Sequence, residues 1–344
     1  MSEYRSNITV QDAAHRVGAA SHVVVTTHAK PDADAIGSVI ALTRALRVRG
    51  SRADAWLMPP VPAHLAALRG ADIARIYEGP ASLGSPELVV VLDTGAWSQL
   101  EPMRSELEPL MARTMVVDHH LSGDVPAAWR LVDGTAAACC ELVAQLLDAW
   151  GDQVDAYGDA AVAEALFVGL AGDTGWFRFS NTRPQTHGLA ARLLRLGVDH
   201  SALFHQMQQL ERPQKLALLT RALACLEWVD DHRGAIMVLR SSDFDQTGAK
   251  LEETENIVDV PQMVSTVQVV VLITQADTSN GDRSIRMSFR SKPGPGAIDV
   301  ARLAQDFGGG GHARAAGAKT GGSIEDVVEK VKTLLSDAMT ESAQ

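Results

Sequence analysis

The chain has 344 residues, a length that suits two domains of ordinary size better than one. Apolar residues make up 46% of it and charged residues 21%, a balance that excludes wholesale disorder and a coiled coil. Its 31 Lys and Arg residues against 42 Asp and Glu residues give a net charge of −11, which disfavours binding along long duplex nucleic acid.

Two features of the sequence indicate where the protein works. No apolar run approaches the roughly 18 to 20 residues that span a bilayer, and the N-terminal segment lacks the basic and apolar regions of a signal peptide. The chain has 3 cysteines, and the neighbours Cys139 and Cys140 are poorly placed to form a disulfide. We therefore expect a cytoplasmic protein with no membrane contact.

The first half of the chain alternates between strand-like and helix-like segments. Short apolar runs that end abruptly in a polar residue are typical of buried parallel strands, and they are followed by segments with helically spaced apolar residues. The expected strands are 23–28, 87–93 and 114–120, and the expected helices are 34–49, 136–150 and 159–171. This order predicts an α/β fold, a doubly wound and mainly parallel sheet.

The second half of the chain predicts a connector and a smaller α/β domain. A long helical tract at 200–229, interrupted at Pro213, shows no strand signal. Strand-like runs at 234–240, 267–275 and 284–291 follow, then the glycine run 308–311 and a final helix at 324–335. The expected division is a first domain at 1–195, a helical connector at 196–230 and a second domain at 231–340.

Each of the three expected strands in the first half ends in His or Asp. His28 ends the first run, Asp93 the second, and Asp118 with His119 and His120 the third. Because open α/β sheets bind ligands at the carboxyl ends of their strands, we expect these side chains to converge. An aspartate buried at the end of a strand is costly unless it meets a cation or hydrogen-bond donors.

Two further segments add carboxylates to this set. Asp32 and Asp34 follow His28 at the turn into the first long helix, where alternate carboxylates of a tight loop can face neighbouring cations. The alternative is that one of them only caps that helix. Asp173 interrupts an apolar helical run that would otherwise continue.

The donor types indicate hard divalent cations. The motifs contain aspartates and histidines but no cysteine, which argues against a structural zinc site. Carboxylate oxygens mixed with imidazole suit Mn²⁺, with Mg²⁺ or Co²⁺ as substitutes. So many acidic ligands exceed the needs of one cation, and a pair of cations about 3.5 to 4 Å apart would use them all.

A glycine-rich segment near the C-terminus predicts an anion site. Glycines let the backbone approach a phosphate closely, although a glycine run alone could be a flexible linker. Basic residues surround this run in an otherwise acidic protein, so we expect a phosphate group to bind there. The predicted substrate-binding residues are Arg286, Arg290, Ser291, Gly309, Gly310, Gly311, His312 and Arg314.

Together these motifs resemble the DHH phosphoesterase superfamily. The first segment reads HxxxDxD at 28–34, and Asp93, DHH at 118–120 and DTG at 173–175 follow in the family's order. The segment FGGGGHARAAG at 307–317 resembles the DHHA1 substrate domain of the same proteins. The resemblance implies one cation held by His28, Asp32 and Asp93, a second held by Asp34, Asp93, His119 and Asp173, and catalytic roles for Asp93, His120 and Asp118. In these roles Asp93 bridges the cations, His120 faces the scissile phosphate and Asp118 orients a neighbouring imidazole.

The combination of one DHH and one DHHA1 domain is similar to the NrnA-type nanoRNases. That similarity implies hydrolysis of oligoribonucleotides of about two to five nucleotides and removal of the 3′-phosphate of adenosine 3′,5′-bisphosphate. Linear or cyclic dinucleotides are alternative substrates, and a non-catalytic nucleotide sensor or a processive DNA exonuclease are alternative classes. The sequence leaves a monomer and a homodimer both open.

Three positions depart from the family pattern. Ala33 stands where glycine is frequent in the family. The family usually carries an arginine within several residues after the aspartate that corresponds to Asp93, whereas the first arginine after Asp93 in this chain is Arg104. The residues 121–124 replace the more frequent small residue followed by Asn. These changes leave the expected metal ligands complete and affect the lining of the substrate site.

Overall fold

The computed structural model describes residues 4–79, 83–151, 156–277, 283–294 and 296–342. The chain divides into two compact units, the first ending at Leu210 and the second beginning at Glu211. Among the described residues, no helix is both long and apolar enough to cross a membrane.

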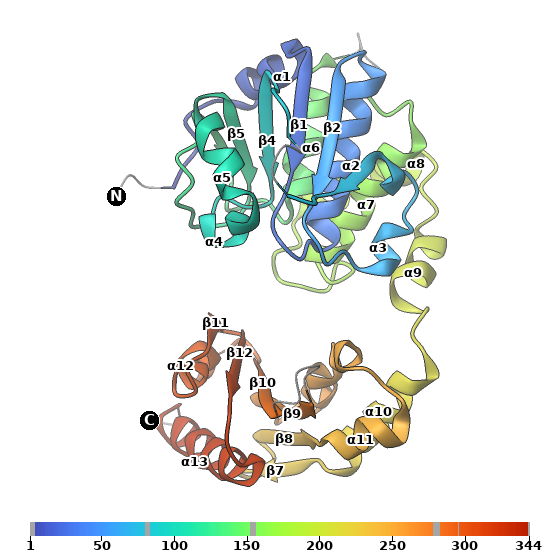
Figure 1. Cartoon of the computed structure of the whole chain (residues 1–344). Helices are drawn as coiled ribbons and strands as arrows, with labels where there is room; N and C mark the ends of the chain where they lie inside the picture. The colour runs from blue at the N-terminus through green and yellow to red at the C-terminus, as the bar shows by residue number, and fades with distance from the viewer. Residues whose placement is uncertain (1–3, 80–82, 152–155, 278–282, 295, 343–344) are drawn as a thin grey trace. The chain divides into compact units, whose positions relative to one another are not determined.

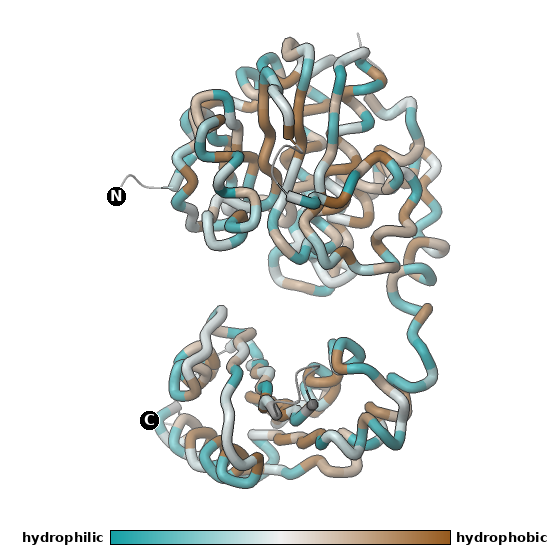
Figure 2. Tube along the Cα trace, in the orientation of Figure 1, coloured by the Kyte–Doolittle hydropathy of each residue, from teal (hydrophilic) through white to brown (hydrophobic). Residues whose placement is uncertain are grey.

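Unit 1 is built on a parallel sheet of 6 strands in the order β3-β2-β1-β4-β5-β6. The strands are β1 (His22–Thr26), β2 (Arg52–Leu57), β3 (Ala74–Ile76), β4 (Leu88–Leu92), β5 (Thr114–Asp118) and β6 (Trp129–Val132). All residues of β4 and β5 are buried, which explains their continuous apolar sequence. Figure 2 shows these central strands mainly in the colour of hydrophobic residues.

Helices cover both faces of this sheet (Figure 1). The helices of unit 1 are α1 (Val10–Ala19), α2 (Ala33–Val48), α3 (Ala63–Ala66), α4 (Trp97–Leu100), α5 (Arg104–Leu107), α6 (Cys139–Asp148), α7 (Ala160–Asp173), α8 (Pro184–Arg195) and α9 (His200–Gln208). Val23 and Val25 of β1 belong to the core formed with α1, α2, α6 and α7, whereas Val24 belongs to the core formed with α4 and α5. Successive side chains of β1 therefore pack into cores on opposite faces of the sheet. The predicted doubly wound, parallel fold is confirmed.

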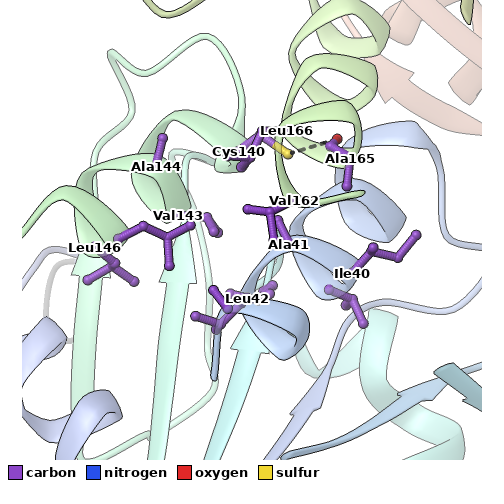
Figure 3. Packing of buried hydrophobic residues seen from close by; sticks show 14 of the residues in the cluster. Ile40, Ala41, Leu42, Cys140, Val143, Ala144, Leu146, Val162, Ala165 and Leu166 are labelled. Carbon is purple, nitrogen blue, oxygen red and sulfur yellow. Dashed lines mark hydrogen bonds between the residues drawn. The ribbon is translucent and has the colours of Figure 1, made fainter. Parts of the chain in front are cut away.

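The largest of these cores forms where α2, α6 and α7 pack against one another. Figure 3 shows Ile40, Val143 and Leu166 from the three helices in this core. Gly37 of α2 permits the close approach, because a Cβ atom there would lie 2.4 Å from the carbonyl oxygen of Ala165 in α7. The three expected helices of the first half correspond to α2, α6 and α7.

Unit 2 has a mixed sheet of 6 strands in the order β11-β12-β10-β9-β8-β7, in which only the β8–β9 pair is parallel. Its elements are α10 (Pro213–Ala224), β7 (Glu227–Val229), β8 (Gly234–Leu239), α11 (Ser241–Thr247), β9 (Val269–Asp277), β10 (Arg283–Ser291), α12 (Val300–Gln305), β11 (Gly310–His312), β12 (Ala315–Thr320) and α13 (Ile324–Ser342). Helices α12 and α13 pack on one face, and α10 packs on the other over β8 and β9.

The helical tract expected to connect the domains contributes to both units. Helix α9 lies in unit 1, where Leu203 joins the core, and α10 lies in unit 2, where Leu218 and Ala222 are fully buried. Pro213 is the first residue of α10, a position where its missing N–H is not needed. The tract ends in the short strand β7, which its sequence did not indicate.

Candidate metal centre

The polar residues predicted at the strand ends lie on three neighbouring strands. β1 pairs with β4, and β4 pairs with β5, all parallel, so their carboxyl ends form one edge of the sheet. His28 follows β1, Asp93 follows β4 directly, and Asp118 is the last residue of β5. The fold therefore brings these side chains together, as expected for a parallel sheet.

Asp32 has two functions available to its carboxylate. It is the N-cap of α2, where Oδ1 accepts hydrogen bonds from the backbone N–H groups of Asp34 and Ala35, both at 3.0 Å. The same oxygen lies 3.9 Å from His28 Nε2. Asp32 thus caps the helix, as the alternative interpretation of its sequence position predicted, and it does so through Oδ1. Its Oδ2 atom can still bind a cation.

Asp34 is held by the start of a distant helix. Its carboxylate is fully buried and accepts hydrogen bonds from the backbone N–H groups of Cys139 and Cys140. The N-cap of α6, Ala138, offers no side-chain cap, so Asp34 occupies the place of a capping residue. The positive end of the helix dipole favours a negative charge at that point.

Asp93 lies at the centre of the cluster. Its side chain is 2% exposed, and its backbone has a φ of +63°, in the left-handed region. Oδ1 lies 3.2 Å from His119 Nε2, and Oδ2 lies 3.5 Å from His28 Nε2. Because the two oxygens face different histidines, Asp93 is placed to serve two neighbouring sites.

His119 completes the second half of the cluster. Its Nε2 atom lies 3.2 Å from Asp173 Oδ2 and 3.8 Å from Asp34 Oδ2. Its Nδ1 atom lies 3.3 Å from the carbonyl oxygen of Ala136, which favours the tautomer that carries a proton on Nδ1. This arrangement leaves Nε2 to face the carboxylates.

Within the described part of the chain, three groups of side chains could each hold a metal ion, with ligand atoms within 4.8 Å of one another. The groups are His28 with Asp32 and Asp93, Asp34 with His119 and Asp173, and Asp93 with His119 and His120. Asp93 and His119 each belong to two groups, so the groups are parts of one larger cluster. The structure brings together the six side chains predicted as metal ligands, and their role as ligands stays a prediction.

The chemistry of the cluster fits divalent cations. Asp93 Oδ1 and His119 Nε2 are buried and have no hydrogen-bond partner of acceptable geometry. Buried polar atoms are otherwise almost always satisfied, so these two point to a missing ligand. The donors are carboxylate oxygens and imidazole nitrogens, a set that suits Mn²⁺ or Mg²⁺.

Crowded carboxylates dominate the electrostatics of the cluster. Burial raises the pKa of Asp34 well above its usual value, and the charges of Asp93 and Asp173 raise it further. Burial lowers the pKa of His119, but the carboxylates of Asp173 and Asp93 outweigh it and raise that pKa to about 11. Asp93 likewise outweighs burial at His28 and raises its pKa to about 9. Protons on these imidazoles thus take the place of positive charge that a cation would supply.

Asp118 orients His120 and is itself held by a residue that the sequence did not indicate. His120 Nδ1 lies 2.7 Å from Asp118 Oδ1, and the side chain of His120 is 49% exposed. The other oxygen, Oδ2, accepts a hydrogen bond of 2.6 Å from the hydroxyl of Tyr4. Burial and the Asp118 charge both raise the pKa of Tyr4, so this hydroxyl keeps its proton. The two residues are 114 positions apart, and no local motif links them.

Two of the predicted substrate-binding arginines share one face of β10. Arg286 and Arg290 alternate with Met287 and Phe289, which lie in the core on the other face. Arg286 is exposed and pairs in register with Lys319 of β12. The Nε atom of Arg290 lies 3.3 Å from a carboxylate oxygen of Asp259, which neutralises part of its charge.

Ser291 and Arg314 contact each other at the end of β10. Arg314 Nη1 donates hydrogen bonds to Ser291 Oγ at 3.2 Å and to the carbonyl oxygen of Ile298 at 2.8 Å. The buried Ser291 hydroxyl donates to the same carbonyl at 2.7 Å. These contacts give both residues a structural function, and their contact with substrate stays a prediction.

The glycine run is an ordered strand and turn. Gly310, Gly311 and His312 form β11, which pairs with β12. A Cβ atom at Gly309 would lie 2.2 Å from the carbonyl oxygen of Gly317, and Gly311 has a φ of +146°. Glycine is required for this close pairing, and His312 next to it is exposed. The alternative of a flexible linker is excluded for these residues.

Comparison with known proteins identifies the class to which this fold and site belong. Residues 22–170 match the N-terminal domain of the DHH family, and residues 234–340 match the DHHA1 domain. The chain therefore belongs to the DHH/DHHA1 phosphoesterases. This membership was predicted from the motifs and is confirmed.

Among individual proteins, the chain is similar to bifunctional oligoribonucleases and PAP phosphatases called NrnA. It is 29% identical to the one from Thermus thermophilus over 319 residues, which cover 92% of this chain and 90% of the relative. It is 27% identical to the one from Bacillus subtilis, with 86% of this chain and 88% of the relative covered.

Solved structures support the fold. An exopolyphosphatase-related protein from Bacteroides fragilis superposes with a TM-score of 0.87 at 21% identity, covering 97% of both chains. RecJ from Thermus thermophilus, in complex with Mn²⁺, gives a TM-score of 0.58 at 16% identity and covers 97% of this chain but 54% of RecJ. Both likenesses concern the fold.

Proposed function

We propose that the protein hydrolyses very short oligoribonucleotides to mononucleotides and removes the 3′-phosphate of adenosine 3′,5′-bisphosphate. The observation that carries this proposal is the cluster of carboxylates and imidazoles around Asp93, with two buried polar atoms that lack partners. Relatives described as oligoribonuclease and PAP phosphatase cover both units of the chain, which supports the substrate class.

Two divalent cations fit the cluster. His28 and Asp32 would hold one, Asp34, His119 and Asp173 the other, and Asp93 both. Such a pair of cations supplies an activated water for attack on phosphorus. Mn²⁺ suits the donor set, and it is the ion in the solved complex of the related RecJ fold.

The side chains around the cluster position the phosphate. Asp118 holds His120 by its Nδ1 atom and raises its pKa, which favours the protonated imidazole. His120 is half exposed, so its Nε2–H can donate a hydrogen bond to an oxygen of the scissile phosphate. Arg286 and His312, both exposed in unit 2, would bind the second phosphate that dinucleotides and nucleoside bisphosphates share.

A direct test is the hydrolysis of a 5′-phosphorylated diadenylate (pApA) by metal-stripped protein with and without added Mn²⁺. We expect AMP as the product only when Mn²⁺ is present, and release of inorganic phosphate when adenosine 3′,5′-bisphosphate replaces the dinucleotide. Binding of either compound without products would indicate a nucleotide sensor. Degradation of long single strands in preference to pApA would indicate an exonuclease.

Asp93→Asn is the matched variant for this assay. Asn tolerates the left-handed backbone at this position, so the fold should be retained. Loss of the carboxylate charge would weaken both cation sites at once, and we expect kcat to fall at least about a thousandfold, equivalent to about 4 kcal/mol. A rate near that of the wild type would contradict the central role of Asp93.

A further inference from the structure

The loop at 133–138, which joins β6 to α6, lies directly beside the candidate metal centre. The carbonyl oxygen of Ala136 lies 3.3 Å from His119 Nδ1, and the backbone N–H of Cys140, just beyond the loop, donates to Asp34 Oδ1 at 2.9 Å. Asn181 links the same loop to the backbone of Asp173, because its Nδ2 atom donates to the main-chain carbonyl oxygens of Ala137 and Asp173, both at 3.1 Å. The position of this loop therefore affects the whole group formed by Asp34, His119 and Asp173.

On its other side the loop is held by a buried glutamate. Glu141, in the first turn of α6, is 4% exposed. Its Oε2 atom accepts hydrogen bonds from the backbone N–H of Ala137 at 3.2 Å and from Arg183 Nη2 at 2.6 Å. Its Oε1 atom accepts a hydrogen bond from the hydroxyl of Thr186. Three donors therefore hold this buried carboxylate in one position.

Arg183 joins this glutamate to the middle of the loop. While Nη2 donates to Glu141, Nη1 donates to the hydroxyl of Thr135 at 2.9 Å. Arg183 immediately precedes α8, and its backbone N–H donates to Thr186, so the side chain starts from a fixed point. None of the hydrogen bonds of Arg183 reaches the candidate metal ligands themselves.

We propose that Arg183, acting through Glu141 and the loop 133–138, is a positioning residue for one half of the metal centre. It fixes the carbonyl that sets the tautomer of His119 and the helix start that holds Asp34. This inference rests on the proposed function, in that the cluster must bind cations. Substitution of a residue that orients metal ligands commonly lowers the metal affinity by about ten to a hundredfold.

The other half of the centre should not depend on Arg183. His28 Nδ1 lies 3.0 Å from the carbonyl oxygen of Ala29, and Asp32 is held by the first turn of α2. Neither contact involves the loop. Loss of Arg183 should therefore weaken the site of Asp34, His119 and Asp173 and spare the site of His28 and Asp32.

The chain offers a matched control in Arg192. This residue also joins α8 to α6, because Nη1 donates to Asp148 Oδ2 at 2.7 Å, while Nη2 donates to the hydroxyl of Tyr157. The arginine side chains are exposed to a similar extent, 38% for Arg192 and 29% for Arg183, although Asp148 is more exposed than Glu141. The hydrogen bonds of Arg192 do not involve the loop 133–138.

The experiment compares Mn²⁺ binding by the metal-stripped wild type, Arg183→Met and Arg192→Met, measured by calorimetric titration and by electron paramagnetic resonance. We expect two Mn²⁺ sites in the wild type and in Arg192→Met. In Arg183→Met we expect one site unchanged and the other weakened at least about tenfold. Amide hydrogen exchange of the metal-free proteins should be faster at 133–140 in Arg183→Met alone.

The outcomes separate this inference from the proposed function. A wild type that binds no Mn²⁺ overturns both. Two unchanged sites in Arg183→Met, or equal weakening of both sites, overturn the positioning function of Arg183 and leave the proposed function standing. Equal rates of amide hydrogen exchange at 133–140 in the two variants also overturn the positioning function of Arg183 and leave the proposed function standing.

A second variant keeps the test decisive if Arg183→Met does not fold. Asn181 is exposed, and Asn181→Ala removes the link between the loop and Asp173 without disturbing a core. We expect the same selective weakening of one Mn²⁺ site, and its absence overturns the proposal. Arg183→Lys keeps the charge but cannot donate to Glu141 and Thr135 in the same fork geometry, so it should bind the second Mn²⁺ with intermediate affinity.

Discussion

Asp93 combines two properties that each cost free energy in a folded protein. It is buried with an unpartnered oxygen, and its backbone has a positive φ. Burial of a carboxylate oxygen that accepts no hydrogen bond is expensive, and strained backbone persists only where the surrounding structure enforces it. The Asp93 carboxylate faces both His28 and His119. Binding of cations by this carboxylate would explain why the protein retains both unfavourable features at Asp93.

Protons should leave the cluster when metal binds. In the metal-free protein the pKa values of about 9 for His28 and about 11 for His119 keep both imidazoles charged at neutral pH. A cation requires the neutral imidazole, so binding must release these protons, and affinity should rise with pH from neutrality up to these values. Calorimetric titration of Mn²⁺ at about pH 7.5 in buffers of different ionisation enthalpy measures the release. A binding enthalpy that does not depend on the buffer would contradict this prediction.

At the residue scale the sequence indicates the side chains that form the candidate metal centre, but it does not indicate the residues that contact them from distant parts of the chain. The motifs around His28 and His119 are short, and the expected strands place them at one sheet edge. Tyr4 and Arg183 are recognised only from the structure, because their partners Asp118 and Glu141 lie 114 and 42 positions away. Contacts of that range depend on tertiary packing and leave no local pattern.

At the scale of elements, the ligands depend on how α2 and α7 approach each other. Both helices carry candidate ligands, Asp34 in the first turn of α2 and Asp173 at the end of α7. The Cβ atom that Gly37→Ala would add meets the carbonyl oxygen of Ala165 at 2.4 Å, so the helices must separate. We expect a loss of about 1 to 3 kcal/mol in the free energy of unfolding, measured by urea denaturation of the metal-free protein.

Gly188→Ala is the control for this substitution. Gly188 lies inside α8, and a Cβ atom there would meet nothing within 4 Å. Because alanine favours the helix more than glycine does, this variant should be about as stable as the wild type or up to about 1 kcal/mol more stable. Equal destabilisation by both substitutions would show that helix propensity, and not the close contact of α2 with α7, determines the effect.

The elements also differ in how well their sequences indicate them. The buried strands β1, β4 and β5 were predicted because their apolar runs are continuous. The strands β2, β3 and β6 were not predicted. β2 alternates between buried and partly exposed residues, and β3 and β6 are short and lie at the two edges of the sheet. Edge strands bury fewer side chains, so their sequences resemble those of loops.

At the scale of the whole molecule, the proposed function assigns metal binding to unit 1 and phosphate binding to unit 2. The three candidate metal groups found among the described residues all lie in unit 1, whereas exposed basic side chains follow the strands β10, β11 and β12 of unit 2. In a chain with a net charge of −11, we expect these basic side chains to be the groups that attract a phosphate. Substrate affinity and metal loading should therefore respond to different substitutions.

His312→Ala tests this division. His312 is exposed at the end of β11, so its removal should leave the fold and Mn²⁺ binding unchanged. Loss of a hydrogen bond to a phosphate should raise KM for pApA about tenfold, equivalent to about 1.4 kcal/mol, with a smaller effect on kcat. The control is His232→Asn, which removes an exposed histidine of unit 2 at a positive φ that Asn tolerates, and it should leave KM unchanged. Steady-state kinetics and Mn²⁺ titration of the same variant measure the two effects separately. If His312→Ala no longer bound Mn²⁺, His312 would belong to the metal centre, and the proposed division between the units would be wrong.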